Sequence, residues 1–253
     1  MKQVQVRGLK IGEGIPKICA PVVGVTKEEI LESARMAVNT FADFAEWRAD
    51  WYEDIFNDKC MSEMLEALRN ILACMPLLFT FRTRREGGER ETAKEQYAAI
   101  NRKAASSGLV DLIDVEMFSG DEVVKEIIAW AHECNVKVIV SNHDFDKTPE
   151  KGEIVARLCK MQELGADICK IAVMPRERRD VLTLLAATEE MVREYADRPV
   201  ITMSMAGQGL PSRLCGEIFG SAVTFGAVGK ASAPGQIKLE KLRAILEILH
   251  ENM

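Results

Sequence analysis

The sequence predicts a (β/α)8 barrel, the TIM-barrel fold, and three observations lead to that prediction. Short apolar runs, typical of buried parallel strands, recur eight times along the chain. Their first residues lie 22 to 35 residues apart, which leaves room for one helix and two loops in each interval. The length of 253 residues is typical of such a barrel, so we expect one domain over residues 1–253. An open Rossmann-like sheet is the alternative, but no GxGxxG motif follows the first run.

Each expected strand is an apolar run bounded by polar or turn-forming residues. The eight runs are 18–24, 44–50, 77–83, 112–116, 136–141, 166–173, 200–205 and 222–228. Before the first of them, residues 4–12 alternate in polarity around Gly8. This alternation predicts a short β-hairpin that closes the bottom of the barrel.

The segments between the runs carry signals for helix starts and ends. Capping-box patterns at 26–29, 92–95 and 119–122 predict three starts, because the paired side chains satisfy the first free amides of a helix. Thr148 followed by Pro149 predicts a fourth start, and Gly165 predicts where that helix ends. The alternation of runs and helices is therefore unbroken along the chain.

Composition excludes several classes of protein. A net charge of −6 without any Lys/Arg-rich block argues against a nucleic-acid partner. The longest apolar run, 71–79, is too short to cross a membrane and is interrupted by Pro76. The N-terminus lacks the apolar centre of a signal peptide. The seven cysteines show no paired Cys or Cys/His spacing, which argues against disulfides and zinc and favours a cytoplasmic location.

Lys170 is the most informative residue, because it lies inside the sixth apolar run. A buried ammonium group costs several kcal/mol, roughly, unless it is paired with an acid or loses its proton. A neutral lysine amine is a nucleophile that forms a Schiff base with a carbonyl group. Asp114 and Glu116, which share one face of the fourth run, are acids that could pair with Lys170 and make it a structural residue. Both interpretations stay open at this point.

Other polar and sulfur-containing residues gather where the expected strands end, which is where barrels place their catalytic groups. They are Glu46, Arg48, Arg82, Glu86, His143, Met203, Met205, Arg213, Ser232 and Gln236. His143 follows the strand next to that of Lys170 and is a candidate acid or base. The arginines indicate an anionic substrate, and a carboxylate is favoured because no glycine-rich phosphate loop follows the seventh run. The small-residue loop 229–236 has the composition of a mobile lid.

Each of these residues also has an ordinary structural explanation. A strand-end histidine often has a structural role, and a glutamate in a turn, such as Glu86, is usually solvated. Methionines at alternating strand positions usually fill the core, as Met203 and Met205 could.

These motifs resemble one family, the type I 3-dehydroquinate dehydratases. The resemblance covers essentially the whole chain, and its strongest stretches are 46–50, 78–82, 139–145, 165–172 and 232–236. It implies a hydro-lyase of the shikimate pathway, which makes aromatic amino acids. The reaction it implies turns 3-dehydroquinate into 3-dehydroshikimate and water through a lysine imine, without a cofactor or a metal ion. It also implies a homodimer, while the composition argues against a nucleic-acid or membrane partner.

The resemblance also implies roles for individual residues. Lys170 would form the imine, His143 would serve as base and then as acid, and Glu86 would orient His143. Arg213 would bind the substrate carboxylate, with Ser232 and Gln236 closing over it. Three residues would hold the ring hydroxyls and the ketone side, namely Glu46, Arg48 and Arg82. An apolar wall at the imine would consist of Met203 and Met205.

One position departs from the family pattern. Some members place a serine hydroxyl near the substrate at the end of the first strand, where this chain has Pro21, which cannot donate a hydrogen bond. Two other functions remain as alternatives. A class I aldolase would also use a lysine on the sixth strand, but it usually has a phosphate site. A non-catalytic barrel would bind a small carboxylate or a protein partner without any covalent step.

Overall fold

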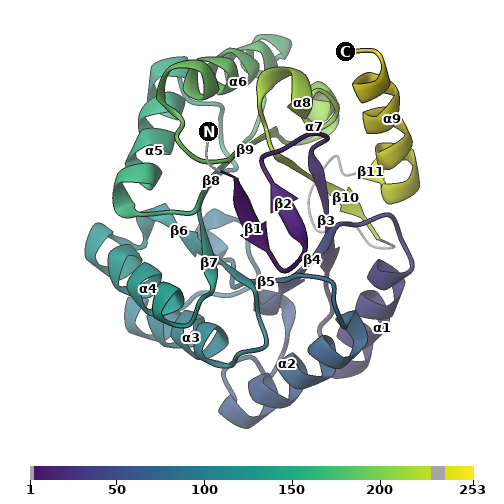
Figure 1. Ribbon diagram of the computed structural model, residues 1–253. Coiled ribbons are helices and arrows are strands. Elements are labelled where there is room, and N and C mark those ends of the chain that lie inside the picture. Colours follow the sequence, from purple (N-terminus) through teal and green to yellow (C-terminus); the bar gives the residue numbers. More distant parts are fainter. Residues whose placement is uncertain (1–2, 229–236) are drawn as a thin grey trace.

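The computed structural model describes residues 3–228 and 237–253, and its centre is a closed ring of parallel strands (Figure 1). The eight strands of the ring are β3 (Lys17–Val22), β4 (Phe44–Arg48), β5 (Leu77–Thr80), β6 (Leu112–Glu116), β7 (Lys137–Asp144), β8 (Ile168–Val173), β9 (Val200–Ser204) and β10 (Val223–Ala227). From β3 to β9 each strand pairs with the next in parallel, and β10 pairs with β3. The amide of Ala222 donates to the carbonyl of Val200 at 2.8 Å, which joins β9 to the start of β10. The predicted barrel is confirmed.

A ninth parallel strand and an N-terminal hairpin complete the sheets. The short strand β11 (Ile237–Lys238) pairs with the end of β10 and was not predicted. The hairpin consists of β1 (Val4–Val6) and β2 (Leu9–Ile11), which pair in antiparallel fashion. Figure 1 shows it lying across the middle of the ring of helices.

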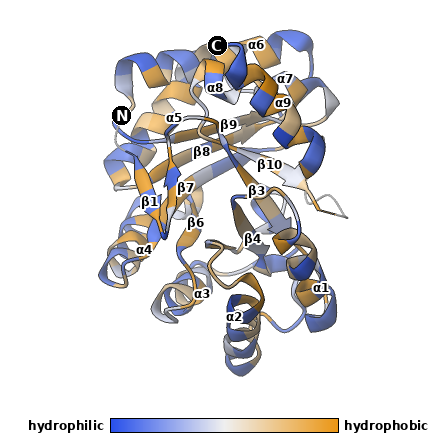
Figure 2. Cartoon of the chain, turned by 45° about the vertical axis from the view of Figure 1, so that its right-hand side comes forward, coloured by the Kyte–Doolittle hydropathy of each residue, from blue (hydrophilic) through white to orange (hydrophobic). Residues whose placement is uncertain are grey.

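The helices lie outside the ring of strands and alternate with them. They are α1 (Lys27–Val38), α2 (Asp58–Leu72), α3 (Lys94–Ser106), α4 (Asp121–Glu133), α5 (Lys151–Leu164), α6 (Arg178–Glu190), α7 (Leu210–Leu214), α8 (Gly216–Phe219) and α9 (Leu239–Glu251). Single turns follow several strands, namely η1 (Ala49–Trp51), η2 (Arg84–Glu86), η3 (Met117–Ser119) and η5 (Gly207–Gly209), and a π-turn, η4 (Met191–Tyr195), extends α6. Figure 2 shows the apolar faces of the helices turned toward the strands.

The predicted helix starts are partly wrong. The capping box at 26–29 is confirmed, since the amide of Glu29 donates to the Thr26 hydroxyl at 3.3 Å. In contrast, α3 begins after Ala93 and α4 begins after Gly120. Neither residue can cap a helix with a side-chain acceptor, so both predicted capping boxes are wrong. Helix α5 begins at Lys151 instead of Pro149.

Two of the residues predicted to cap helices do not cap them. The Thr148 hydroxyl donates to the carbonyl of Met174 at 3.0 Å, which ties the loop before α5 to the end of β8. Ser119 belongs to the turn η3. Gly165 does end α5, with the positive φ of 101° that favours glycine.

The core has two layers that leave one end of the barrel for polar groups. Apolar side chains between strands and helices form the outer layer. Inside the barrel, the hairpin residues Val4, Val6 and Ile11 pack with Phe44 and Leu78 on the strands. Burying a Val or Ile side chain contributes about 1.5–3 kcal/mol, so the hairpin closes this end with apolar contacts. At the opposite end, where the strands finish, the described residues line a cavity that contains charged side chains.

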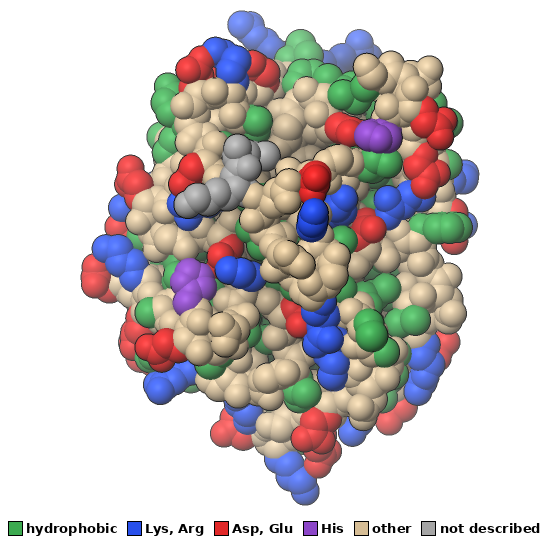
Figure 3. All heavy atoms as spheres, in the orientation of Figure 1, with side chains coloured by type: hydrophobic (Ala, Val, Ile, Leu, Met, Phe, Trp, Pro, Cys, Tyr) green, Lys and Arg blue, Asp and Glu red, His purple; other side chains and the backbone are tan. Residues whose placement is uncertain are grey.

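The hairpin face carries charges of both signs, and the cysteines are free thiols. On the hairpin face, acidic and basic side chains are interspersed rather than gathered in one basic patch (Figure 3). All seven cysteines lie within residues 3–228, and each is a free thiol. In the two described ranges, the helices are too short or too polar for any of them to span a membrane.

Candidate active site

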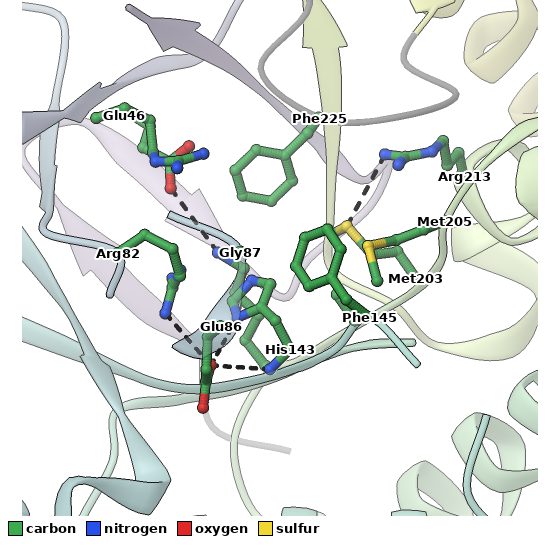
Figure 4. Close-up of a pocket in the computed structure, with 13 residues that line it drawn as sticks. Glu46, Arg82, Glu86, Gly87, His143, Phe145, Met203, Met205, Arg213 and Phe225 are labelled. Carbon is green, nitrogen blue, oxygen red and sulfur yellow. Dashed lines mark hydrogen bonds and ion pairs between the residues drawn. The ribbon is translucent and has the colours of Figure 1, made fainter. Parts of the chain in front are cut away.

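A cavity lies at the C-terminal ends of the strands (Figure 4). Nine residues predicted from the sequence line it, namely Glu46, Arg48, Arg82, Glu86, His143, Lys170, Met203, Met205 and Arg213. Four more were not predicted, namely Gly87, Phe145, Ala172 and Phe225. The predicted Ser232 and Gln236, like the rest of the expected lid, lie outside the described residues.

Strand register brings the central groups together. Strands β7 and β8 pair so that Ser141 lies opposite Lys170 and His143 opposite Ala172. Alternate residues of a strand point to the same side of the sheet. Because Lys170 and Ala172 line the cavity, His143 on the neighbouring strand points into it as well.

Lys170 is almost fully buried and has an acidic partner. Its Nζ donates to Oδ2 of Asp114 at 3.0 Å and lies 3.8 Å from Oε1 of Glu46. The same nitrogen lies 4.7 Å from the centre of the Phe225 ring, within the range of a cation–π contact. The pairing with Asp114 that the sequence suggested is therefore present. Since Lys170 also lines the cavity, the ion pair and a chemical role are compatible.

Asp114 is the centre of a buried network. Arg82 Nη2 donates to its Oδ1 at 2.6 Å, and the Ser141 hydroxyl donates to the same oxygen at 2.6 Å. Burial would raise the pKa of Asp114, but the charges of Arg82 and Lys170 outweigh burial and hold that pKa well below its ordinary value. Arg82 also donates to Glu116 at 3.1 Å. Asp114 is thus a carboxylate at neutral pH.

His143 forms a pair with Glu86, and Figure 4 shows the two side chains pointing toward one another. Oε2 of Glu86 lies 3.1 Å from Nδ1 of His143 and accepts the backbone amide of His143 at 2.9 Å. Burial, together with the charges of Arg82 and Lys170, lowers the pKa of His143 well below its ordinary value. The imidazole is therefore neutral at pH 7 and able to accept a proton.

Two opposed effects act on Glu86. Burial and the nearby charge of Glu116 raise its pKa to about 8, although Arg82 and hydrogen bonds from Asn142 and His143 oppose this increase. The next residue, Gly87, has a φ of 82°, and a Cβ there would lie 2.2 Å from the Phe145 ring. A glycine therefore lets the turn that carries Glu86 pack against the loop that follows His143.

The raised pKa of Glu86 gives a prediction for stability. Between pH 4.5 and pH 8, folded protein holds a proton on Glu86 that the unfolded chain releases. The free energy of unfolding should therefore fall as pH rises, by at most about 1.4 kcal/mol per pH unit from this group. Glu86→Gln should remove this part of the pH dependence. Urea denaturation at pH 6 and pH 9 checks it, and parallel curves for both proteins would contradict it.

Arg48 and Glu46 are also held by neighbours. Arg48 makes a two-bond fork with Asp50, from Nε and from Nη2, at 2.9 Å each. The Thr80 hydroxyl donates to Glu46 Oε1 at 3.0 Å. The acidic and basic groups on this side of the cavity are thus fixed before any substrate binds.

The opposite side of the cavity combines sulfur, aromatic rings and one arginine. Arg213 lies in the short helix α7, and its Nη1 lies 3.8 Å from the sulfur of Met203 (Figure 4). Burial lowers the pKa of Arg213 to about 10, so it remains a cation at neutral pH. Met205, Phe145 and Phe225 complete this mainly apolar side.

The sequence predicts which residues line the cavity better than it predicts which residues contact one another. Phe225 lies on the same strand face as Val223, which alternation could have shown to be internal. Asp50 and Ser141 belong to the recognised strand ends, but nothing in the sequence says which arginine each would contact. Across residues 3–228 and 237–253, no group of three or more His, Cys, Asp or Glu side chains is arranged to hold a metal ion.

Comparison with known proteins agrees with this geometry. The model of the type I 3-dehydroquinase family matches residues 18–253. The 3-dehydroquinate dehydratase of Clostridioides difficile (strain 630) is 54% identical over 252 residues, which cover 100% of this chain and 99% of that protein. The enzyme of Salmonella agona (strain SL483) is 55% identical over 251 residues, with 99% and 100% coverage.

Solved structures show the same similarity. The crystal structure of the type I enzyme from Clostridium difficile with covalently modified comenic acid has a TM-score of 0.97 at 54% identity and covers 100% of this chain and 99% of that chain. The enzyme of Geobacillus kaustophilus HTA426 has a TM-score of 0.96 at 40% identity, with 99% and 97% coverage. From the family match, the identities and the fold together, this chain belongs to the type I 3-dehydroquinase family of hydro-lyases.

Proposed function

We propose that this chain dehydrates 3-dehydroquinate through an imine formed by Lys170. The observation that carries the proposal is the placement of the Lys170 amine and the neutral His143 imidazole in the lining of one cavity. The Clostridium difficile relative, which has been crystallised with covalently modified comenic acid, supports a covalent step in this family. The aldolase and the non-catalytic alternatives have no comparable support.

Imine formation needs a proton acceptor, because an ammonium group cannot attack a carbonyl carbon. Lys170 would pass one proton to the neutral imidazole of His143. The amine would then add to the ring ketone to give a carbinolamine. His143 would return the proton to the departing hydroxyl group, so that one water is released and an iminium remains.

Dehydration then follows from the position of the leaving group. The iminium withdraws electrons and acidifies the neighbouring C–H, so His143 would take that proton to give an enamine. The enamine electrons would expel the hydroxyl group on the next carbon, which His143 would protonate as it leaves. Hydrolysis of the imine would release the conjugated ketone and regenerate Lys170. The sum of these steps is the loss of one water molecule from the substrate.

Two buried acidic residues beside the cavity would serve this sequence, Asp114 as an anion and Glu86 by orienting His143. Asp114, held as an anion by Arg82, lies 3.0 Å from Lys170 Nζ and would stabilise the positive iminium. Glu86 would hold His143 through Nδ1 and leave Nε2 for the substrate. The apolar side chains of Met203, Met205 and Phe225 would limit the access of water to the imine.

Arg213 would bind the substrate carboxylate. The family resemblance implies this role, and Arg213 lies in the lining of the cavity. Arg213 lies across the cavity among apolar side chains, where a charge-assisted pair is strong. Glu46 and Arg48 would then face the ring hydroxyls, and Arg82 would act mainly through Asp114.

This assignment predicts the behaviour of an Arg213 variant. Arg213→Ala should raise KM for 3-dehydroquinate about 10- to 100-fold, because a charged hydrogen bond contributes about 1.5–3 kcal/mol. Steady-state kinetics measure this change. The matched control is Arg243→Ala, which breaks a partly buried ion pair with Asp43, outside the lining of the cavity, and should leave KM within about twofold. An unchanged KM in Arg213→Ala would contradict the assignment.

A direct assay tests the function. The product contains a carbon–carbon double bond conjugated with a ketone, so its formation raises ultraviolet absorbance. We expect absorbance to rise when purified protein is mixed with 3-dehydroquinate, without added metal or cofactor. No rise with 3-dehydroquinate, or cleavage of phosphorylated sugars instead, would overturn the proposal.

The family also suggests where and how the protein works. We infer a role in the shikimate pathway, a homodimeric state and a cytoplasmic location from the family resemblance and the cysteine pattern. Light scattering during size-exclusion chromatography measures the oligomeric state. A mass of one chain, 28.2 kDa, would contradict the dimer.

A further inference from the structure

Asp50 is a buried carboxylate whose contacts lead to the cavity. It lies in the turn η1, directly after β4, and its side chain is fully buried. The cavity lining includes Arg48 but, among the described residues, not Asp50. Any effect of Asp50 on the substrate must therefore pass through the groups it holds.

Four donors from three segments converge on this carboxylate. Arg48 donates from Nε to Oδ1 and from Nη2 to Oδ2, both at 2.9 Å. The backbone amide of Arg82 donates to Oδ1 at 3.3 Å, and that of Glu89 donates to Oδ2 at 3.1 Å. The backbone carbonyl of Asp50 accepts from Nε of Arg90 at 3.1 Å. Each carboxylate oxygen of Asp50 thus accepts from two donors.

The fork fixes the guanidinium group of Arg48. Two parallel hydrogen bonds to one carboxylate set both the position and the plane of the group, whereas a single bond would leave it free to rotate. Arg48 has three rotatable bonds beyond Cβ, so an unheld side chain would lose conformational freedom each time a substrate bound. Asp50 removes that freedom in advance.

The two backbone contacts extend the effect to the segment that carries Glu86. The amides of Arg82 and Glu89 lie on either side of that segment, and both are held by the Asp50 side chain. Asp50 thus joins the end of β4 to the chain that follows β5. Its strongest bonds, however, are those to Arg48.

We propose that Asp50 is a positioning residue that sets affinity for the substrate by holding Arg48 in one orientation at the cavity wall. This inference rests on the proposed function, because the substrate that Arg48 meets is taken to be 3-dehydroquinate. Asp50 itself contacts no substrate. The competing explanation is that Asp50 only links two loops and has no effect on substrate affinity.

Kinetics of Asp50→Asn separate the two explanations. The asparagine keeps the shape of the side chain but cannot accept two bonds from Arg48 with a full charge. We expect KM to rise about 10-fold while kcat stays within about threefold. A structural tie would instead lower the unfolding temperature and kcat, since it would displace Glu86, and would leave KM of the folded enzyme unchanged.

A double-mutant cycle makes the test sharper. In an Arg48→Ala background, Asp50→Asn should change KM by less than about twofold, because the group it acts through is gone. An equal effect of Asp50→Asn in both backgrounds would overturn the proposal. If circular dichroism shows that Asp50→Asn does not fold, Asp50→Glu replaces it in the same cycle. This variant keeps the charge but displaces the two hydrogen bonds to Arg48, so the same outcomes support or overturn the proposal.

The matched control lies at the other end of the same strand. Asp43 accepts the amide of Ile18 and pairs with Arg243, both at 2.6 Å, far from the cavity. Asp43→Asn should lower stability and leave KM unchanged. If the wild type turns over 3-dehydroquinate but Asp50→Asn has an unchanged KM, the role of Asp50 is rejected and the proposed function stands. Absence of turnover in the wild type would reject the proposed function.

Discussion

Lys170→Ala is expected to lower kcat for 3-dehydroquinate dehydration by about 10⁵-fold or more. Alanine cannot form the imine, and without it the C–H next to the ketone is too weak an acid for a histidine. Stopped assays with high enzyme concentrations measure the residual rate. The fold should persist, because Asp114 keeps its hydrogen bonds to Arg82 and Ser141 when the lysine is removed.

A second lysine on a barrel strand provides the control. Lys137 lies at the start of β7 and pairs with Asp167 at 3.1 Å, at the opposite end of the barrel from the cavity. Lys137→Ala should keep kcat within about twofold, since loss of a partly exposed ion pair costs at most about 1 kcal/mol of stability. Comparable rates for Lys170→Ala and Lys137→Ala would remove Lys170 from the chemistry.

His143→Ala is expected to lower kcat by about 10²- to 10⁴-fold, the usual contribution of a general acid and base. The variant should still bind 3-dehydroquinate, because Arg213 and Arg48 are unchanged. It should form the imine more slowly than the wild type, since His143 also moves the protons of that step. Rapid-quench kinetics with mass detection measure both quantities.

The control for this prediction is another histidine with a carboxylate partner. His132 pairs with Asp167 at 2.8 Å and lies outside the cavity. His132→Ala should keep the wild-type rate. A His143→Ala enzyme with wild-type turnover would show that a different group moves the protons.

The fold could be predicted from the sequence because its signals are local. Eight apolar runs at similar intervals identify eight strands, and every end of the observed strands lies within three residues of the end of the predicted run. Helix starts were harder, because capping depends on which residue takes the non-helical backbone conformation. Thr148 illustrates this, since its hydroxyl is used by the end of a strand that is distant in sequence.

The residues that line the site could be predicted from the sequence, but the contacts between them could not. Period-two alternation and the strand-end rule select residues that reach the cavity, which is why Glu46, His143 and Lys170 were found. Which acid meets which base depends on register between strands. The network of Asp114 with Arg82, Lys170 and Ser141 joins three strands and the segment after β5, and the sequence alone cannot order these contacts.

Lys170 shows this limit most clearly. On the sequence alone, an acid partner and a chemical role stood as competing explanations. In the structure, Asp114 contacts the amine and the amine also lines the cavity. The acid that satisfies the buried lysine is placed to stabilise the iminium that the lysine would become.

Intact-mass analysis after reduction tests the central claim most directly. Wild-type protein and Lys170→Ala would each be incubated with 3-dehydroquinate and borohydride, which reduces an imine to a stable amine. We predict one adduct per chain in the wild type, located on Lys170 by peptide mapping, and none in the variant. A wild-type protein that turns over substrate without any adduct, or an adduct on another lysine, would contradict the imine mechanism.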